Sequence, residues 1–329
     1  MTMKTIRFGS RGSQLALWQA EQKKSLLETR HPGLTVTITK IKTTGDKILD
    51  VPLAKVGGKG LFVKEIEEAL LDERIDLAVH SMKDVPTDFP KGLHLAAITQ
   101  REDPRDVVIS RGGKKLKDFP YGAKIGTSSL RRQAQLLHVR PDFEIVQLRG
   151  NLDTRMRKLN ELGLECIILA GAGVKRLGWS DRITEYLSPE ISLPAIGQGA
   201  LGIETRIEDR GINNLVAFFD HLPTSISVRA ERALLKRLEG GCQVPIAAYG
   251  TVVADSSASL NTPINGQLHL IGLVASTDGK KIIKDSVSGR TDKAEILGIK
   301  LAEKLLKMGA WDILKEVYKT APPMQGGAG

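Results

Sequence analysis

The sequence has little of what several classes of protein depend on. Its 329 residues include two cysteines, 4% aromatic residues and no apolar run of membrane-spanning length. Two cysteines in unlike settings form no disulfide framework, which indicates a reducing compartment and predicts a cytoplasmic protein. Few aromatic rings argue against binding of single-stranded nucleic acid, whose bases stack on such rings. The six histidines show no HxxxH spacing and the cysteines no CxxC spacing, so we expect no metal site.

The charge balance is strongly basic, with a net charge of +10 and a pI near 9.5. Such a balance indicates nucleic acid, an anionic surface or an acidic small molecule as the partner. The basic residues are spread among loops and expected helix starts and form no block. This distribution favours an acidic small molecule and predicts no nucleic-acid and no membrane partner.

The order of expected elements predicts two similar α/β lobes of the periplasmic-binding-protein type and a small α+β domain. A strand at 6–9, a turn at 10–13 and a helix at 14–30 open the chain, and the same order recurs at 124–137. Turns of this kind direct free N–H groups of a helix start at an anion. Other expected strands lie at 34–41, 75–79, 93–98, 143–149, 166–170, 201–205, 247–254, 267–276 and 281–288, and other helices at 62–73, 153–162, 227–238 and 293–308.

Two proline- or glycine-marked crossings, at 101–106 and 192–200, separate the lobes. We expect a first domain at 1–100 and 200–218, a second at 104–194, a C-terminal domain with a three-stranded antiparallel sheet at 222–320, and a disordered tail at 321–329. Two lobes with facing anion-binding turns predict a cleft between them.

Cys242 and Asp84 are candidate reactive residues. Cys242 lies between Gly240–Gly241 and Pro245, on a tight loop, whereas Cys166 falls in a core strand. On this context alone, a structural cysteine remains the alternative. Asp84 follows the strand 75–79 in a loop with His80, Ser81 and Lys83, where ligands collect in an open α/β sheet.

Asp84 could stabilise a cation or hand over a proton, because neighbouring basic side chains favour its charged form. A helix cap or turn residue is the alternative interpretation. A Cys–His pair of the protease type also stays open, although nothing marks His80 as the partner.

Six arginines fall at expected strand ends or helix starts, and guanidinium forks bind carboxylates with two hydrogen bonds. They are Arg11, Arg131, Arg132, Arg149, Arg155 and Arg176. This set suits a ligand with several carboxylates, and solvated surface residues are the alternative. The glycine-rich segment 42–60, with Lys47, Lys55 and Lys59, predicts a mobile basic flap or, alternatively, a solvated surface loop.

From Arg7 to about Tyr318 the chain resembles the hydroxymethylbilane synthase, or porphobilinogen deaminase, family of tetrapyrrole synthesis. The resemblance is carried by Gly9–Ala16 (GSRGSQLA), Ala78–Pro86 (AVHSMKDVP), Gly126–Arg132 (GTSSLRR), Leu148–Arg155 (LRGNLDTR), Pro194–Gly199 (PAIGQG) and Glu239–Pro245 (EGGCQVP). It implies a transferase that joins four porphobilinogen molecules with loss of ammonia. The chain grows on a covalent dipyrromethane cofactor, and water then releases the linear tetrapyrrole.

The resemblance also implies residue roles. Cys242 would carry the cofactor through a thioether, and Asp84 would assist loss of the amino group and stabilise the azafulvene-like cation. The cofactor would be held by Lys83, Asp84, Thr127, Ser129, Arg131, Arg132, Gly150 and Arg155. Substrate or the growing chain would be bound by Arg11, Ser13, Arg149, Arg176 and Gln198. Lys55, Lys59 and Phe62 would belong to the flap, Arg101 and Pro194 would mark hinges, and the protein would be a monomer.

A solute-binding protein is the main rival, because two α/β lobes around a cleft are also its plan. It predicts a secretion signal, which residues 1–8 do not resemble, and it gives Cys242 no role. A nucleic-acid binder is a weaker third possibility.

Overall fold

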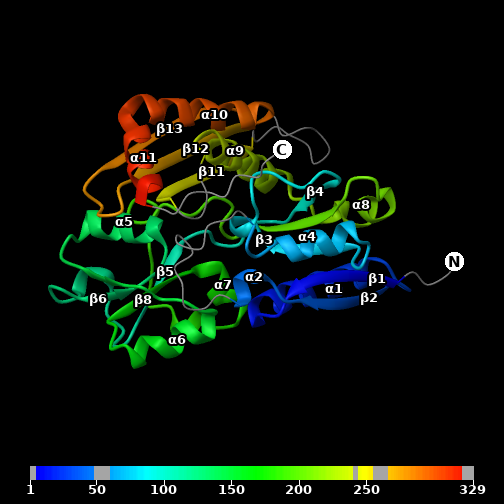
Figure 1. The fold of residues 1–329 in the computed structure, drawn as a ribbon, viewed down its shortest axis with the longest axis horizontal. Coiled ribbons are helices and arrows are strands. Elements are labelled where there is room, and N and C mark those ends of the chain that lie inside the picture. Colours follow the sequence, from blue (N-terminus) through cyan, green and yellow to red (C-terminus); the bar gives the residue numbers. More distant parts are fainter. Residues whose placement is uncertain (1–4, 48–59, 240–243, 255–265, 321–329) are drawn as a thin grey trace. The chain divides into compact units, whose positions relative to one another are not determined.

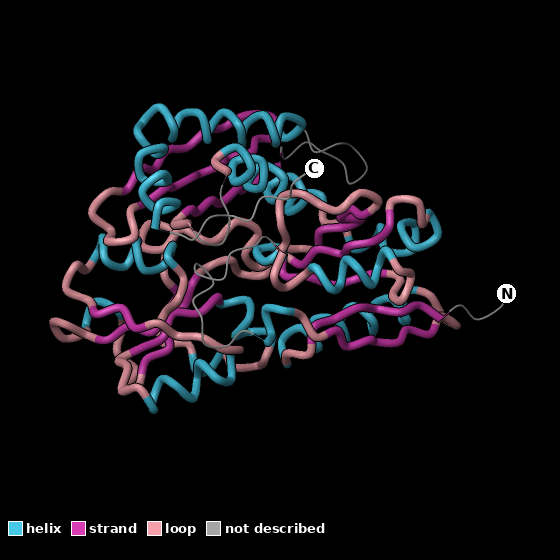
Figure 2. The backbone as a smooth tube through the Cα atoms, in the orientation of Figure 1, coloured by secondary structure: helices cyan, strands magenta, loops and turns pink. Residues whose placement is uncertain are grey.

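The computed structural model describes residues 5–47, 60–239, 244–254 and 266–320. The chain divides into two compact units, and Figure 1 traces their elements. The first unit contains residues 1–49, 59–102 and 199–225, and the second contains residues 50–58, 103–198 and 226–329. Figure 2 shows strands in magenta with helices beside them in both units.

The sheet of the first unit has five strands, and its fourth strand comes from far along the chain. In spatial order they are β2 (Thr35–Ile41), β1 (Thr5–Arg11), β3 (Leu77–Ser81), β10 (Leu201–Arg206) and β4 (Leu93–Ile98). β1 is parallel to β2 and β3, whereas β10 is antiparallel to β3 and β4. The return crossing therefore adds β10 to the first sheet, as predicted.

Both faces of this sheet carry apolar side chains under helices. One core cluster includes Ile6, Phe8, Leu27 and Ile203, and the other includes Ile66 and neighbours on β2, β3 and β4. The helices are α1 (Gln14–Arg30), α2 (Thr44–Lys47), α4 (Lys64–Leu71) and α8 (Arg210–Val216). A sheet buried on both faces presents its functional groups at strand ends and in the turns that follow.

The sheet of the second unit repeats this topology. Its spatial order is β7 (Glu144–Val146), β6 (Lys124–Gly126), β8 (Cys166–Ala170), β5 (Asp106–Ser110) and β9 (Glu185–Tyr186). β6 is parallel to β7 and β8, and β5 is antiparallel to β8 and β9. The helices are α5 (Leu130–Val139), α6 (Leu152–Glu161) and α7 (Gly171–Arg176).

The same unit contains a three-stranded antiparallel sheet, which α10 covers (Figure 1). Its elements are β11 (Ile246–Ala254), β12 (Gly266–Ala275), β13 (Ile282–Arg290), α9 (Leu222–Arg237), α10 (Ala294–Leu305) and α11 (Trp311–Thr320). Leu234, Leu270 and Leu301 lie in its core. A second cluster joins Ala134 of α5 and Leu193 to Ala247 and Leu273, so this sheet packs on α5.

The predicted fold class is confirmed, namely two similar α/β lobes and a small domain with a three-stranded antiparallel sheet. The domain boundaries and the cleft stay predictions. Some local expectations were wrong. His80 and Ser81 end β3 instead of forming a loop, because both pair with β10. Ser10 and Arg11 belong to β1, where they pair with β2.

Further corrections concern helices. Gly171–Arg176 is a helix and no loop, and the expected helix 293–308 ends at Leu305. A kink follows at Gly309, whose φ of 99° favours glycine, and α11 begins at Trp311. The short helix α2 begins the segment expected to be a flap, while 48–59, Cys242 and the tail 321–329 lie outside the described residues.

We expect Gly298→Ala to lower the free energy of unfolding by about 1–3 kcal/mol, because overpacking forces neighbours apart. A Cβ at 298 in α10 would collide with the carbonyl oxygen of Ala230 in α9. Gly112→Ala is the control, since nothing lies within 4 Å of a Cβ there. Urea denaturation of both variants checks this, and equal midpoints would contradict the close approach of the two helices.

Candidate functional site

Asp84 lies on a turn that is anchored by its buried neighbour. β3 ends at Ser81, and the 3-10 turn Met82–Asp84 follows. The Met82 side chain is 1% exposed, and its N–H donates to the carbonyl of Ala200 over 3.1 Å. The Val85 N–H closes the turn on the carbonyl of Met82 over 3.3 Å. The turn is thereby fixed while the side chains of Lys83 and Asp84 stay partly exposed.

Arg11, at the end of β1, is held by a carboxylate of its own unit. Its Nε donates to Oδ1 of Asp46 over 3.2 Å, and its guanidinium carbon lies 4.2 Å from the centre of the Phe62 ring. Burial would raise the pKa of Asp46, but hydrogen bonds from Arg11 and Thr43 outweigh it and lower that pKa. Any carboxylate that approached Arg11 would therefore compete with Asp46 or use the outer edge of the guanidinium.

The centre of the second unit is a fully buried carboxylate, Asp106, at the start of β5. Nη1 of Arg131 lies 2.8 Å from its Oδ2, and Nη2 of Arg132 lies 2.7 Å from its Oδ1. Ser192 donates to Oδ2 over 2.8 Å, and Nε2 of Gln198 donates to Oδ1 over 2.9 Å. The Asp106 carboxylate therefore binds four side chains. Three of them were predicted site residues, namely Arg131, Arg132 and Gln198, and Ser192 is new.

Arg131 and Arg132 also donate hydrogen bonds to backbone carbonyl groups. Nη1 of Arg131 donates to the carbonyl of Leu193 over 2.6 Å, and Nη1 of Arg132 donates to that of Ile168 over 3.0 Å. Both side chains are nearly buried, with 5% and 7% exposed. Their guanidinium groups are therefore structural as well as candidate ligands for carboxylates.

This cluster has a net positive charge, because two guanidinium groups face one carboxylate. Burial would raise the pKa of Asp106, but the charges and hydrogen bonds of Arg131 and Arg132 hold it well below the usual range. Burial lowers the pKa of Arg131, which the charge of Asp106 only partly opposes. The excess charge favours an anion at this place in the unit.

Three predicted hydroxyl residues have local structural partners. Ser13 and Ser129 are the N-caps of α1 and α5, and their side chains accept from the N–H groups of Ala16 and Arg132. Oγ1 of the buried Thr127 accepts from the N–H of Ser129 over 3.2 Å. Helix capping thus explains Ser13 and Ser129 without a ligand, as their positions before helices allow.

The predicted arginines that follow β7 and β8 keep part of their surface. Arg149, Arg155 and Arg176 are each partly exposed. Nε of Arg155 donates to the carbonyl of Gly150 over 2.8 Å, and Gly150 has a φ of 109°, which favours glycine. Burial lowers the pKa of Arg149. These side chains suit carboxylates better than the nearly buried pair does.

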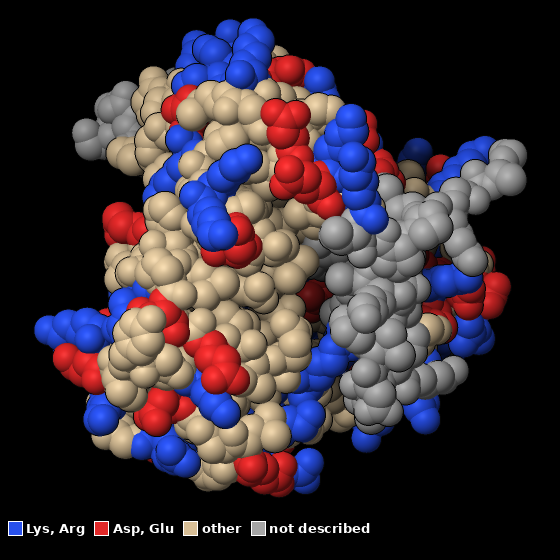
Figure 3. Space-filling view, turned by 60° about the vertical axis from the view of Figure 1, so that its left-hand side comes forward, with Lys and Arg blue, Asp and Glu red and all other residues tan. Residues whose placement is uncertain are grey.

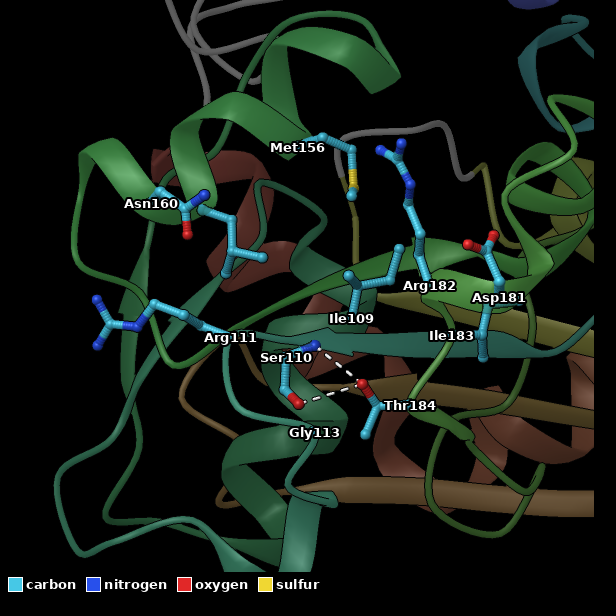
Figure 4. Close-up of a pocket in the computed structure, with 11 residues that line it drawn as sticks. Ile109, Ser110, Arg111, Gly113, Met156, Asn160, Asp181, Arg182, Ile183 and Thr184 are labelled. Carbon is cyan, nitrogen blue, oxygen red and sulfur yellow. Dashed lines mark hydrogen bonds between the residues drawn. The ribbon is translucent and has the colours of Figure 1, made fainter.

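A cavity of about 640 Å³ lies elsewhere in the second unit and contains none of the predicted site residues. Figure 4 shows Ser110 and Thr184 on its wall, joined by two hydrogen bonds, with Arg111 and Arg182 near its edges. We do not assign this cavity to the site.

Sequence reasoning missed Asp106 and Glu231. Glu231, fully buried in α9, accepts from the N–H groups of Gly197 and Gly250 over 2.7 and 2.9 Å, which holds the crossing next to Gln198. The buried guanidinium groups of Arg131 and Arg132 require a counter-ion, but no local sequence pattern identifies Asp106 as that residue.

Three predicted site residues lie outside the described residues, namely Cys242, Lys55 and Lys59. Phe62 is described, and its ring lies against the guanidinium of Arg11. No group of residues suited to a metal ion occurs in the part of the chain that the structure describes. On the face shown in Figure 3, described Lys and Arg side chains are interspersed with Asp and Glu.

Comparison with known proteins gives a consistent result. Residues 6–214 match the family model for porphobilinogen deaminase, dipyromethane cofactor binding domain, and 225–307 match that for its C-terminal domain. Porphobilinogen deaminases of Geotalea uraniireducens and Geobacter metallireducens are 61% identical over 319 residues, which is 97% of this chain and 96% of each relative. That of Geobacter sulfurreducens is 60% identical with the same coverage.

A solved periplasmic aliphatic sulphonate binding protein from Escherichia coli, SsuA, aligns with 72% of this chain and 71% of its own. The two sequences are 14% identical, and the TM-score is 0.39.

The family models and the porphobilinogen deaminase relatives define a cofactor-dependent transferase of porphyrin synthesis. The chain belongs to the porphobilinogen deaminase family. Its activity is that of a hydroxymethylbilane synthase, which joins four porphobilinogen molecules head to tail on a dipyrromethane cofactor and releases ammonia. Within the described residues, no helix is long and apolar enough to cross a membrane.

We expect Asp106→Asn to lower the free energy of unfolding by about 3–5 kcal/mol, because it leaves two buried guanidinium groups without their carboxylate. The pKa of Asp106 is lowered by folding, so its contribution is present above the unfolded pKa and is lost as pH falls through the folded pKa. The asparagine variant should lose this acid dependence. Denaturant titrations from neutral to acid pH check it, with the exposed Asp118→Asn as control. A variant as stable as the control would contradict the role of Asp106.

Proposed function

We propose that Asp84 is the catalytic group of this hydroxymethylbilane synthase and that Cys242 carries its cofactor through a thioether. The observation that carries the role of Asp84 is its place on a turn held by buried Met82 while Asp84 itself stays partly exposed. Accessibility permits contact with substrate, and the anchored turn fixes the direction of the carboxylate.

The residues of the second unit fit a ligand rich in carboxylates. The Asp106 cluster carries an excess positive charge, and Arg149, Arg155 and Arg176 are partly exposed. We propose that the acetate and propionate groups of the cofactor are held by Arg155 and the outer edges of Arg131 and Arg132. Thr127, Ser129 and Gly150 of the same unit, and Lys83 of the first unit, would also bind the cofactor. Arg11, Ser13, Arg149, Arg176 and Gln198 would bind substrate or the growing chain, and Lys55, Lys59 and Phe62 would form the flap.

When bound, the cofactor would supply a nucleophilic pyrrole carbon. Each condensation would form one C–C bond and break the C–N bond of the substrate aminomethyl group. The departing nitrogen would take a proton and leave as ammonia, and the pyrrole carbon that attacks would lose a proton. Asp84 would stabilise the substrate-derived cation and hydrogen-bond pyrrole N–H groups, a role that depends on a fixed carboxylate. Water supplies the hydroxyl group in the final release.

We also propose that the protein acts as a cytoplasmic monomer without nucleic acid. The two cysteines indicate a reducing compartment, and the interspersed charges on the face shown in Figure 3 support a small-molecule partner.

Asp84→Asn keeps the size of the side chain and removes its charge, so we expect kcat to fall by about 10²–10⁴-fold. Cofactor content should stay unchanged, because Asp84 is not its attachment point. Steady-state turnover of porphobilinogen and intact mass of the same preparation check both statements. Near-normal turnover with full cofactor would refute the assigned role.

Cys242→Ser should be recovered without cofactor, because a hydroxyl group replaces the thiol that forms the thioether. The test is the intact mass under denaturing conditions, with peptide mapping across residue 242. Cys166→Ser is the matched control and should keep the added mass of two linked pyrrole units. A Cys242→Ser protein that keeps this mass, or wild-type protein that stays bare after addition of porphobilinogen, would contradict the attachment.

A further inference from the structure

Three buried titratable side chains of the first unit lie on the elements that support the Asp84 turn. They are Glu67 of α4, His80 of β3 and Glu204 of β10, which are 8%, 5% and 1% exposed. Nε2 of His80 lies 2.8 Å from Oε2 of Glu204. In the antiparallel register His80 faces Gly202, two residues from Glu204, so both side chains lie on the same face of the sheet. α4 packs on β3 and β10.

The cluster needs a proton. Oε1 of Glu204 is buried and has no hydrogen-bond partner among the described residues. Burial, followed by the charge of Glu204, raises the pKa of Glu67 to about 7, and the charge of His80 opposes this shift. Once Glu67 ionises, its negative charge and that of Glu204 repel each other in a buried place, where repulsion is poorly screened.

Other charged groups do not relieve this repulsion. Glu68, on the same helix, also raises the pKa of Glu67. The remaining charged or titratable residues of the strands packed against α4 have partners elsewhere. Arg7 pairs with Asp76, Arg11 with Asp46, His94 with Asn213, and Arg206 with Asp209 and Asp76.

The cluster is mechanically connected to the Asp84 turn. His80 precedes Met82 by two residues, and the N–H of Met82 bonds to Ala200 just before β10. The pairing of β3 with β10 therefore sets where the turn begins. Because the pKa of Glu67 is raised by folding, the free energy of unfolding falls as pH rises between about 4.5 and 7. The charged cluster thus weakens the packing of α4 on these two strands.

We propose that Glu67, His80 and Glu204 form a proton-holding cluster that positions the Asp84 turn, and that loss of its proton as pH rises through neutrality lowers turnover. This inference rests on the proposed role of Asp84. Glu67 is a positioning residue and has no contact with substrate in this account.

The test is the pH profile of kcat for the holoenzyme and for Glu67→Gln, whose amide cannot ionise. We expect the alkaline midpoint to move upward by at least one pH unit, with KM changed less than twofold at neutral pH. Glu21→Gln, exposed on α1, is the control and should keep the wild-type profile. Superimposable profiles of wild type and Glu67→Gln would overturn the proposal.

A second measurement does not depend on the variant or on catalysis. In wild-type protein with ¹³C-methyl methionine and ¹³C-carboxyl glutamate, the Met82 methyl signal should shift with the same midpoint as the Glu67 carboxyl. A Met82 signal that ignores this titration overturns the proposal. The Asp84→Asn variant should show the same coupled shift of the Met82 and Glu67 signals. An active Asp84→Asn enzyme would refute the catalytic role of Asp84, whereas the presence or absence of this coupled shift tests the cluster independently of that role.

Discussion

A buried carboxylate, Asp106, is the constraint on which the second unit depends. A charge taken out of water is tolerated only when paired and hydrogen-bonded, and here the partners come from separate segments. Arg131 and Arg132 belong to the first turn of α5, while Ser192 and Gln198 belong to the crossing at 192–200. One ionic centre thereby fixes a strand start, a helix start and a chain crossing, and its surplus charge remains for an anion.

Two other arginines that we propose to bind carboxylates are also fixed by contacts within their own unit. Arg11 is fixed by Asp46 and the Phe62 ring, and Arg155 by the carbonyl of Gly150. Side chains held in this way lose little freedom when a carboxylate arrives, so less binding energy is spent on ordering them. Such pre-positioned side chains suit a pyrrole chain that changes in length, because they need no reordering as each new ring binds.

Local patterns were sufficient for much of the fold. Gln14–Arg30, Leu93–Ile98 and Cys166–Ala170 have the predicted bounds, because capping residues and apolar runs mark their ends. His80 was misplaced since its strand is extended by pairing with β10, more than a hundred residues away.

The candidate site was predictable in residue type but only partly in role. The spacing of Arg131 and Arg132 indicates anion binding, whereas Asp106, their counter-ion, lies in another element and has no local signal. Ser13 and Ser129 illustrate the converse, because a hydroxyl before a helix serves equally as cap and as ligand.

The position of β10 has a consequence for how the chain acquires its structure during synthesis. The second sheet is complete once Tyr186 is available, whereas the first lacks the strand between β3 and β4 until residues 201–206 emerge. During synthesis, the edges of β3 and β4 that pair with β10 therefore stay unpaired while the later strands β5–β9 can already form their sheet. Closure of the sheet that carries Asp84 is a late event, made by long-range pairing.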